Sequence, residues 1–184
     1  MESVARAERR AKEHSATRAS ILSAARKVAE REGAREFSLR GVAAEAGFAP
    51  AALYGYFRNK DEMLVALAAD DLTALSHAMR DADGLAEAAT AALDHLSKTE
   101  TIAAASSALP MDSAIERLFN GRLITALKAL SDASGSPVDS REQQADVVLT
   151  AASLVGLAVL ARSGRLEALG FSTGELIARL SQTG

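Results

Sequence analysis

Apolar residues recur at helical spacing along most of the chain, and the first clear run begins after Thr17. Between this residue and Gly33 they lie three or four positions apart and share one helical face: Ile21, Leu22, Ala25, Val28 and Ala29. A glycine directly after such a run is typical of a left-handed helix C-cap. The pattern predicts a helix over about residues 17–32.

Two short helices are predicted next. Ser38 is a good N-cap residue, and apolar positions repeat after it until Gly47, which indicates a helix of about eight residues. Pro50 stands where it suits the first turn of another helix, which we expect over residues 50–56. The two helices would be joined by a tight turn at Gly47.

The remainder of the chain continues the helical pattern. Asn59 and Glu62 form a capping signal at the start of a long periodic segment, predicted as a helix over 60–81. Glycines, Pro110 and the cluster at 134–137 divide the residues after this helix into five more helices, expected at about 85–97, 100–108, 112–132, 139–162 and 173–181. With 41 alanines and only 4% aromatic residues, the composition favours helix over strand. We therefore expect an all-α protein with about nine helices.

Charge is distributed unevenly along the 184 residues. The net charge is -3, but residues 1–60 hold 12 basic and 7 acidic side chains, whereas residues 61–184 hold 9 and 17. A basic N-terminal segment followed by an acidic remainder is typical of a small nucleic-acid-binding module joined to a different module. A solvated charged helix would give the same asymmetry, so charge alone does not decide. Residues 1–16 are expected to form a basic N-terminal tail, either frayed or a helix extension. Its Arg6, Arg9, Arg10 and Lys12 would follow DNA phosphates or enter the minor groove, or the tail would be disordered.

The most apolar segment is 147–161, which is flanked by Asp146 and Arg162. Its 15 residues are fewer than the about 20 that cross a bilayer, so it is interpreted as a buried helix and no membrane partner is expected. The charged N-terminus has no uninterrupted apolar stretch and does not resemble a signal peptide. We expect a cytoplasmic protein.

The segment 38–57 carries the functional information. Two short helices joined at a tight turn and packed on a preceding helix can place the second helix in the major groove of DNA. Any compact pair of helices would share this pattern, so the spacing by itself leaves a helix-turn-helix and an ordinary helical hairpin equally open.

The residues themselves narrow this choice. Thr17 to Leu64 contains Thr-Arg and Ile-Leu-x-Ala-Ala at its start, Val-Ala and Ala-Gly around the turn, and Leu-Tyr-x-Tyr-Phe-x-x-Lys near its end. In this order and spacing it resembles the N-terminal DNA-binding domain of the tetracycline-repressor (TetR) family of bacterial transcription regulators. The resemblance covers about 48 of the 184 residues. It implies a helix-turn-helix DNA-binding domain at 17–60 and a helical effector-binding and dimerisation domain at 61–184.

Carried over position by position, the resemblance implies a set of DNA-binding residues: Ser38, Arg40, Ala51, Ala52, Tyr54, Tyr56 and Lys60. Ser38 would cap its helix near a phosphate, and Arg40 would reach a base edge or a phosphate. An arginine can supply two parallel donors to guanine, which suits direct readout. The tyrosines match aromatic positions of the recognition helix, and Lys60 matches a phosphate-binding lysine at a helix N-terminus. Each could instead be structural: Tyr54 a core aromatic, and Arg40 or Lys60 a solvated charge.

The sequence also departs from the family pattern. Ala49, Ala51 and Ala52 stand where a hydroxyl or a glycine is usual, so several Ser or Thr hydroxyl donors are missing from the start of the recognition helix. We expect modest sequence discrimination that depends on Arg40, the tyrosines and DNA shape. The alternative is a helical ligand-binding or protein-interaction protein of the same fold that has lost specific DNA binding.

By resemblance, the last two helices, at about 139–162 and 173–181, would pair with their copies in a homodimer, which would then bind a palindromic operator. Ala152 and Gly156 are small, lie four residues apart and would allow another helix to approach closely. By resemblance, the helices between residues 61 and 160 would enclose an effector pocket, and we expect the effector to be small and largely apolar. The candidate lining of this pocket, for which plain core packing is the alternative, consists of Met79, His95, Met111, Ile115 and Phe119.

Catalysis and metal binding have little support. The chain has no cysteine, and no Ser-His-Asp order or phosphate loop is found. His77 and His95 lie 18 positions apart without nearby paired carboxylates. We expect no catalytic residue, no metal and no cofactor, and an α-helical enzyme is the most remote interpretation.

Overall fold

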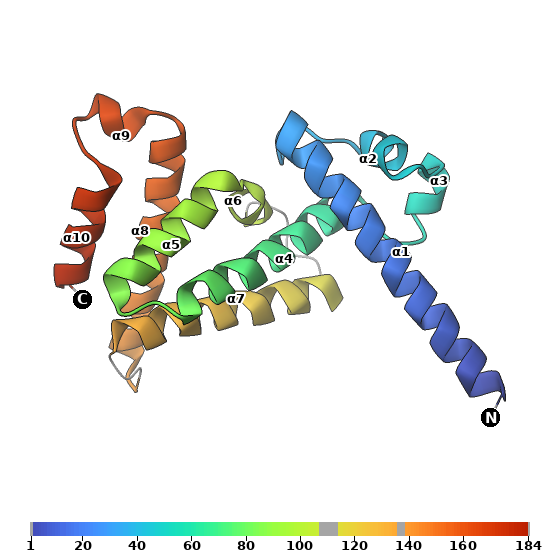
Figure 1. The fold of residues 1–184 in the computed structure, drawn as a ribbon, viewed down its shortest axis with the longest axis horizontal. Coiled ribbons are helices and arrows are strands. Elements are labelled where there is room, and N and C mark those ends of the chain that lie inside the picture. The colour runs from blue at the N-terminus through green and yellow to red at the C-terminus, as the bar shows by residue number, and fades with distance from the viewer. Residues whose placement is uncertain (1, 107–113, 136–138, 184) are drawn as a thin grey trace. The chain divides into compact units, whose positions relative to one another are not determined.

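The computed structural model describes residues 2–106, 114–135 and 139–183, and these ranges contain helices and no strand (Figure 1). The all-α prediction is confirmed. Ten helices lie in the described ranges: α1 (Glu2–Glu32), α2 (Leu39–Ala46), α3 (Pro50–Leu53), α4 (Lys60–Arg80), α5 (Leu85–Lys98), α6 (Thr101–Ala105), α7 (Ala114–Ser134), α8 (Arg141–Arg162), α9 (Arg165–Ala168) and α10 (Thr173–Thr183). The chain divides into two compact units, Met1–Leu67 and Ala68–Gly184.

The first unit is built on the apolar face of α1. Ile21, Ala25 and Val28 are fully buried on this face. Phe37 and Phe57, each 1% exposed, complete the core from the segments on either side of α2 and α3. Other buried apolar residues of this unit include Leu22, Ala29, Val42, Ala43, Leu53, Met63, Leu64 and Leu67. Burial of two phenylalanines and several aliphatic chains supplies most of the favourable energy for this unit.

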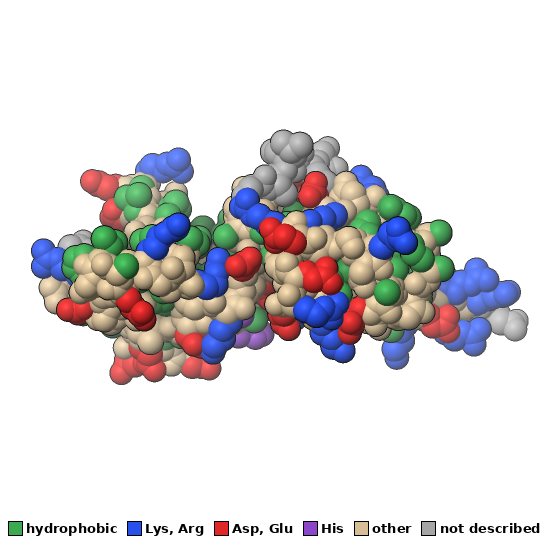
Figure 2. Space-filling model, turned by 90° about the horizontal axis from the view of Figure 1, so that it is seen from above, with side chains coloured by type: hydrophobic (Ala, Val, Ile, Leu, Met, Phe, Trp, Pro, Cys, Tyr) green, Lys and Arg blue, Asp and Glu red, His purple; other side chains and the backbone are tan. Residues whose placement is uncertain are grey.

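Helix α1 begins fifteen residues earlier than the predicted start at residue 17. Residues 5–16 are helical and exposed along their whole length. They are rich in alanine, arginine and glutamate, which are strong helix formers, so the helix continues into solvent without an apolar face. Apolar periodicity locates the part of a helix that is buried, and therefore it missed this part. Figure 2 shows Lys and Arg side chains gathered at this end of α1.

Helix α2 is capped at both ends by the residues that the sequence predicts, Ser38 and Gly47. Ser38 accepts a hydrogen bond at its Oγ from the Gly41 backbone N–H at 3.1 Å, which caps α2. Gly47 ends α2 in the left-handed conformation with φ 72°. Helix α3 is shorter than expected and ends at Leu53, but its chain stays coiled because the Tyr56 N–H donates to the Leu53 carbonyl at 2.9 Å.

The N-terminus of α4 is capped by hydrogen bonds among residues 58–62. The Glu62 N–H donates to Oδ1 of Asn59 at 2.8 Å, as the capping signal predicts. The Glu62 carboxylate accepts from the backbone N–H of Arg58 at 2.6 Å and from its Nε at 3.2 Å. In a capping box the glutamate would accept from the backbone N–H of the cap residue itself, here Asn59. Glu62 instead accepts from the N–H of Arg58, one residue earlier.

The second unit packs α5 against α7, α8 and α10. A buried polar contact ties α4 to the junction of α5 and α6. The side chain of Asp71, which is 3% exposed, accepts hydrogen bonds from the hydroxyls of Thr99, at 3.0 Å, and of Thr101. Burying a carboxylate without such donors would cost free energy, so the bond to Asp71 is expected to hold Thr101, the first residue of α6, in place.

Two short elements follow α8. Helix α9 was not predicted, because four residues give no periodic signal, and Gly164 allows it to start through a left-handed conformation with φ 68°. At the start of α10 the Oγ and backbone N–H of Ser172 donate to Glu175 at 2.7 and 2.8 Å. These bonds lower the pKa of the Glu175 carboxyl below its ordinary value.

Helix α8 is covered on one side only. Leu154 and Ala158 are buried, whereas Val148 and Leu149 are 52% and 64% exposed. By length and composition alone, this 22-residue helix, with a mean hydropathy of 1.8 over its most apolar stretch, could cross a membrane. The expectation of a helix buried all round is therefore wrong for the single chain.

We expect Gly47→Ala to destabilise the first unit by about 1–2 kcal/mol, the cost of a left-handed conformation for a residue with a Cβ. No atom lies within 4 Å of the added methyl, so the effect is one of backbone conformation. Gly55→Ala is the control, because Gly55 does not have a positive φ, and it should change stability by less than about 0.5 kcal/mol. Urea denaturation measures both, and equal effects would contradict this role of Gly47.

Candidate nucleic-acid interface and interior cavity

The segment around α3 presents a surface with one buried anchor. Leu53 is fully buried, and the segment packs against α2. The residues on either side of it point outward and are exposed: Ala49, Pro50, Ala51, Ala52 and Gly55. The protruding face is therefore small and methyl-rich, which leaves its backbone accessible.

The two tyrosines differ in their surroundings. Tyr54 is 61% exposed, which excludes the core alternative for this residue. Tyr56 is half-buried, and its ring stacks on that of His14 with centroids 4.6 Å apart and an interplanar angle of 25°. Most of Tyr54 is therefore accessible to a ligand, whereas Tyr56 stacks on a residue of α1.

Ser38 and Arg40 stand at the start of α2 and are both exposed. The Ser38 hydroxyl is already used for capping, so its remaining lone pair and proton are the groups that a phosphate would meet. Helix α2 is held on α1 by Glu45, which accepts from Arg31 at 3.3 Å and lies 3.9 Å from Lys27. The hydrogen bonds that Arg31 donates to Glu32 and Glu45 raise the pKa of its guanidinium.

Lys60 has contacts that the sequence did not reveal. Its Nζ donates to the backbone carbonyl of Arg35 and lies 5.0 Å from the centre of the Phe37 ring. The side chain is half-buried. Lys60 thus binds α4 to the loop before α2, and it keeps further N–H groups for a second acceptor because an ammonium has three donors.

An apolar cavity of about 60 Å³ lies inside the second unit. Side chains from five helices line it, including Leu75 and Met79 of α4, Leu96 of α5, Ile102 of α6, Ala126 of α7 and Leu154 of α8. Of the five predicted lining residues, Met79 is placed here. His95 on α5 and Ile115 and Phe119 on α7 are half-buried but are not part of this lining, and Met111 lies outside the described residues.

His95 has one unusual feature. Its Nε2 is buried and has no hydrogen-bond partner among the described residues. The described part of the chain contains no cluster of three or more potential metal ligands.

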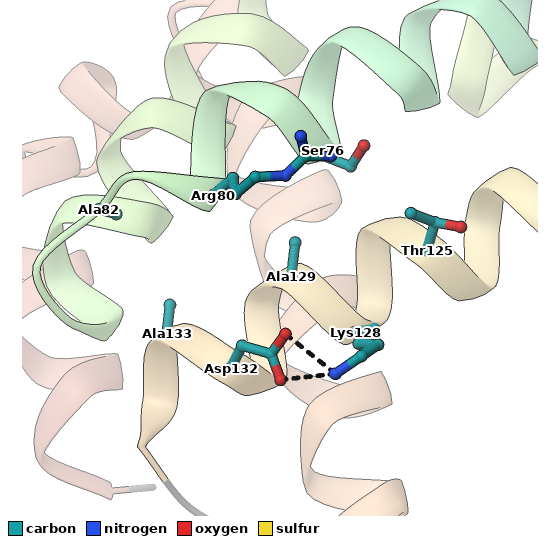
Figure 3. A pocket seen from close by; sticks show the side chains of 8 residues that line it. All are labelled: Ser76, Arg80, Ala82, Thr125, Lys128, Ala129, Asp132 and Ala133. Atoms are coloured by element: carbon teal, nitrogen blue, oxygen red, sulfur yellow. Dashed lines mark hydrogen bonds and ion pairs between the residues drawn. The ribbon is translucent and has the colours of Figure 1, made fainter.

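Two further hollows lie outside the apolar interior of this unit. One, of about 290 Å³, lies between α4 and α7 and is lined by Ser76, Arg80, Lys128 and Asp132 (Figure 3). Lys128 and Asp132 form an ion pair in which Nζ lies 2.9 Å from Oδ1 and 3.0 Å from Oδ2. The other, of about 840 Å³, is an open groove between α7 and α8 with Ile124 and Val148 on its walls. Sequence reasoning predicted neither, because each depends on the angle between two helices.

The exposed side of α8 carries Ala152 and Gly156, as well as larger apolar residues. Five of the exposed residues on this side follow one another at steps of four, three, four and three positions: Ala145, Leu149, Ala152, Gly156 and Val159. This is the spacing of a coiled-coil seam. We call these five residues the α8 stripe.

Comparison with known proteins gives consistent results. The family model for bacterial regulatory proteins of the tetR family matches residues 21–67. No curated protein sequence matches the chain significantly.

Several solved structures share the fold over most of the chain. A protein of unknown function from Rhodococcus sp. RHA1 is 24% identical, with 91% of this chain and 92% of that one covered and a TM-score of 0.67. A TetR transcriptional regulator from the same organism is 21% identical, with coverage of 94% and 96% and a TM-score of 0.65. FadR from Bacillus subtilis, determined in complex with stearoyl-CoA, is 14% identical, with coverage of 89% and 95% and a TM-score of 0.57.

Proposed function

Because its N-terminal unit is a domain of the TetR family of bacterial regulatory proteins, we propose that this protein is a homodimeric, ligand-responsive repressor of a palindromic operator. One observation carries the DNA-binding part: α3 is anchored by Leu53 and turns a compact, exposed face with Tyr54 away from the core. A helix presented in this way can enter the major groove. We place the protein in the cytoplasm and assign it no catalytic activity.

The proposed DNA contacts fall into two kinds. Ser38, Tyr56 and Lys60 stand at helix starts or beside α1 and suit phosphates, which position a protein on DNA without reading sequence. Arg40 and Tyr54 are exposed and suit base edges or thymine methyl groups. Ala51 and Ala52 have no side-chain donor, so they allow close approach and contribute methyl contacts.

Replacing Arg40 and Lys60 separately tests this division. Lys60→Ala should weaken binding to every sequence alike and reduce the slope of log K against log salt by about 1 per subunit. Arg40→Ala should cost about 1–3 kcal/mol on the operator and much less on random DNA. Fluorescence anisotropy with DNA from upstream of the protein's own gene, and with random duplexes, measures both.

The control for this experiment is folding stability, because Lys60 also contacts Arg35 and Phe37. Binding is therefore compared only at temperatures where both variants are fully folded by circular dichroism. If the two variants lose specific and non-specific binding in the same proportion, Arg40 is a phosphate contact and the division is wrong.

The homodimer is proposed on the α8 stripe. An apolar helix face exposed to water is typical of a surface that another molecule covers. The residues of the stripe are separated by four, three, four and three positions, which fits a second helix packed alongside. Ala152 and Gly156 at the middle let the backbones approach closely. Two-fold symmetry would then double the contacts of a small DNA-binding head on a palindrome.

Gly156→Leu is expected to separate the two copies, raising the dimer dissociation constant at least about tenfold, since one tenfold step corresponds to about 1.4 kcal/mol. Gly121→Leu is the matched control: Gly121 is also exposed within a helix and a Cβ there meets nothing within 4 Å, but it lies outside the stripe. Analytical ultracentrifugation at micromolar concentration measures both. A monomeric wild-type protein would refute the dimer.

The effector is proposed to bind at the cavity beside Met79. Its lining is apolar, and small residues such as Ala126 leave room for it to widen, so a small, largely apolar molecule fits best. The fold is shared with FadR from Bacillus subtilis, which was determined with stearoyl-CoA, a ligand with a long apolar chain. A ligand that enlarges this cavity would shift the packing of α4, which begins at the DNA-binding unit.

Thermal-shift measurements test the effector class. Small apolar compounds should raise the melting temperature of the wild-type protein, and Ala126→Leu, which fills the cavity, should abolish the shift. Thr125→Leu adds similar bulk on the exposed side of the same helix and should leave the shift intact. Stabilisation by highly charged compounds alone would contradict an apolar effector.

A second candidate function rests on the absence of hydroxyls at Ala49, Ala51 and Ala52. It is a helical ligand-binding or protein-interaction protein of the same fold without specific DNA binding. The anisotropy experiment separates the two, because this candidate predicts no preference of the wild-type protein for any duplex.

A further inference from the structure

The exposed half of α1 carries a row of side chains at intervals of four residues: Arg6, Arg10, His14 and Arg18. Residues four apart lie one above another on a helix, about 6 Å apart along its axis. The row is therefore a single ridge, which we call the α1 ridge. It lies wholly before residue 21, where the match to the family begins.

The C-terminal end of the α1 ridge is fixed to the recognition segment. His14 stacks on Tyr56, and the guanidinium of Arg18 lies 4.6 Å from the centre of the Phe57 ring. Both partners closely follow the exposed Tyr54. The ridge thus starts beside the proposed DNA-contacting surface and continues away from it as rigid helix.

The other charged residues of this part of α1 lie at different angles from the ridge. At about 100° per residue, Glu8 and Lys12 lie about 160° from Arg10, on the far side of the helix. Glu13 lies about 60° from Arg10 and flanks the ridge, and Arg9 lies about 100° from Arg10. Ala7 and Ala11 border the ridge and leave room for a close approach.

We propose that the α1 ridge binds the phosphates that flank the base pairs contacted by α3, so that each subunit contacts a longer stretch of DNA. This rests on the proposed DNA-binding function. Arg6 lies about 12 Å beyond His14 along the helix axis, and the major groove is about 12 Å wide. A helix held beside Tyr56 can therefore carry Arg10 and Arg6 to the groove edge. A rigid helix suits phosphates on the outside of the duplex and does not thread a minor groove.

The test compares two double variants with the same loss of charge. Arg6→Ala with Arg10→Ala removes the outer half of the ridge, and Arg9→Ala with Lys12→Ala removes two charges that lie outside the ridge. Alanine is the best helix former and all four residues are exposed, so both variants should keep the helix. Circular dichroism verifies this.

Binding to DNA from upstream of the protein's own gene is measured by anisotropy between about 50 and 200 mM salt. The ridge variant should reduce the salt slope by about 2 per subunit, about 0.9 per phosphate contact, and shorten the hydroxyl-radical footprint at its edges. The variant with Arg9→Ala and Lys12→Ala should change the slope by less than about 0.5 and leave the footprint unchanged.

Equal losses in the two variants, or no loss in the ridge variant, would overturn the assignment of the ridge while DNA binding by the wild-type protein stands. Wild-type protein that binds no duplex even at about 50 mM salt would instead overturn the proposed function, and the ridge proposal with it.

Discussion

Burial of Phe37 and Phe57 against the apolar face of α1 is the interaction on which the N-terminal unit depends. The two rings are almost completely buried, and each lies next to a segment that faces outward. Phe37 precedes the cap of α2, and Phe57 follows the coil that ends α3. Because both ends of the two short helices are pinned, a four-residue helix with no side-chain cap keeps its place. The same rings also receive cations: Lys60 lies over Phe37 and Arg18 over Phe57. The core therefore determines where the positive charges of this unit can stand.

The second unit is organised by a different constraint, the presence of more apolar surface than one chain covers. Helix α8 buries Leu154 and Ala158 and leaves the opposite α8 stripe exposed. Larger apolar side chains on the exposed surface, such as Ile124 and Leu169, add to this excess. Exposed apolar area of this kind indicates a protein contact, or, for a helix of this length, a lipid contact. The polar ends of α8 and its central glycine favour a second helix, which is why we assign the stripe to a homodimer.

Lys60 has a structural role that is compatible with its proposed contact to DNA phosphate. Its bond to the Arg35 carbonyl and its position over Phe37 hold its ammonium at the N-terminus of α4. An ordered ammonium loses less conformational entropy on binding than a free surface lysine would. The structural role and the proposed phosphate contact therefore support each other. For the same reason, a substitution at this position must be separated from its effect on folding.

The helical class, most helix boundaries and the caps at Ser38 and Gly47 could be predicted from the amino-acid sequence alone. These features depend on neighbours within a few positions, which periodicity and capping rules describe. The extension of α1 to Glu2 could not, since a solvated helix has no apolar face to detect. The stacking of Tyr56 on His14, the bond of Lys60 to Arg35, and the position of the cavity beside Met79 but away from His95, Ile115 and Phe119 emerged only in the folded chain. Each of them joins residues distant in sequence whose separation depends on how helices cross. The exposed side of α8 belongs to the same class: an all-round apolar sequence predicts that a helix is covered, but only packing reveals which face its own chain leaves open.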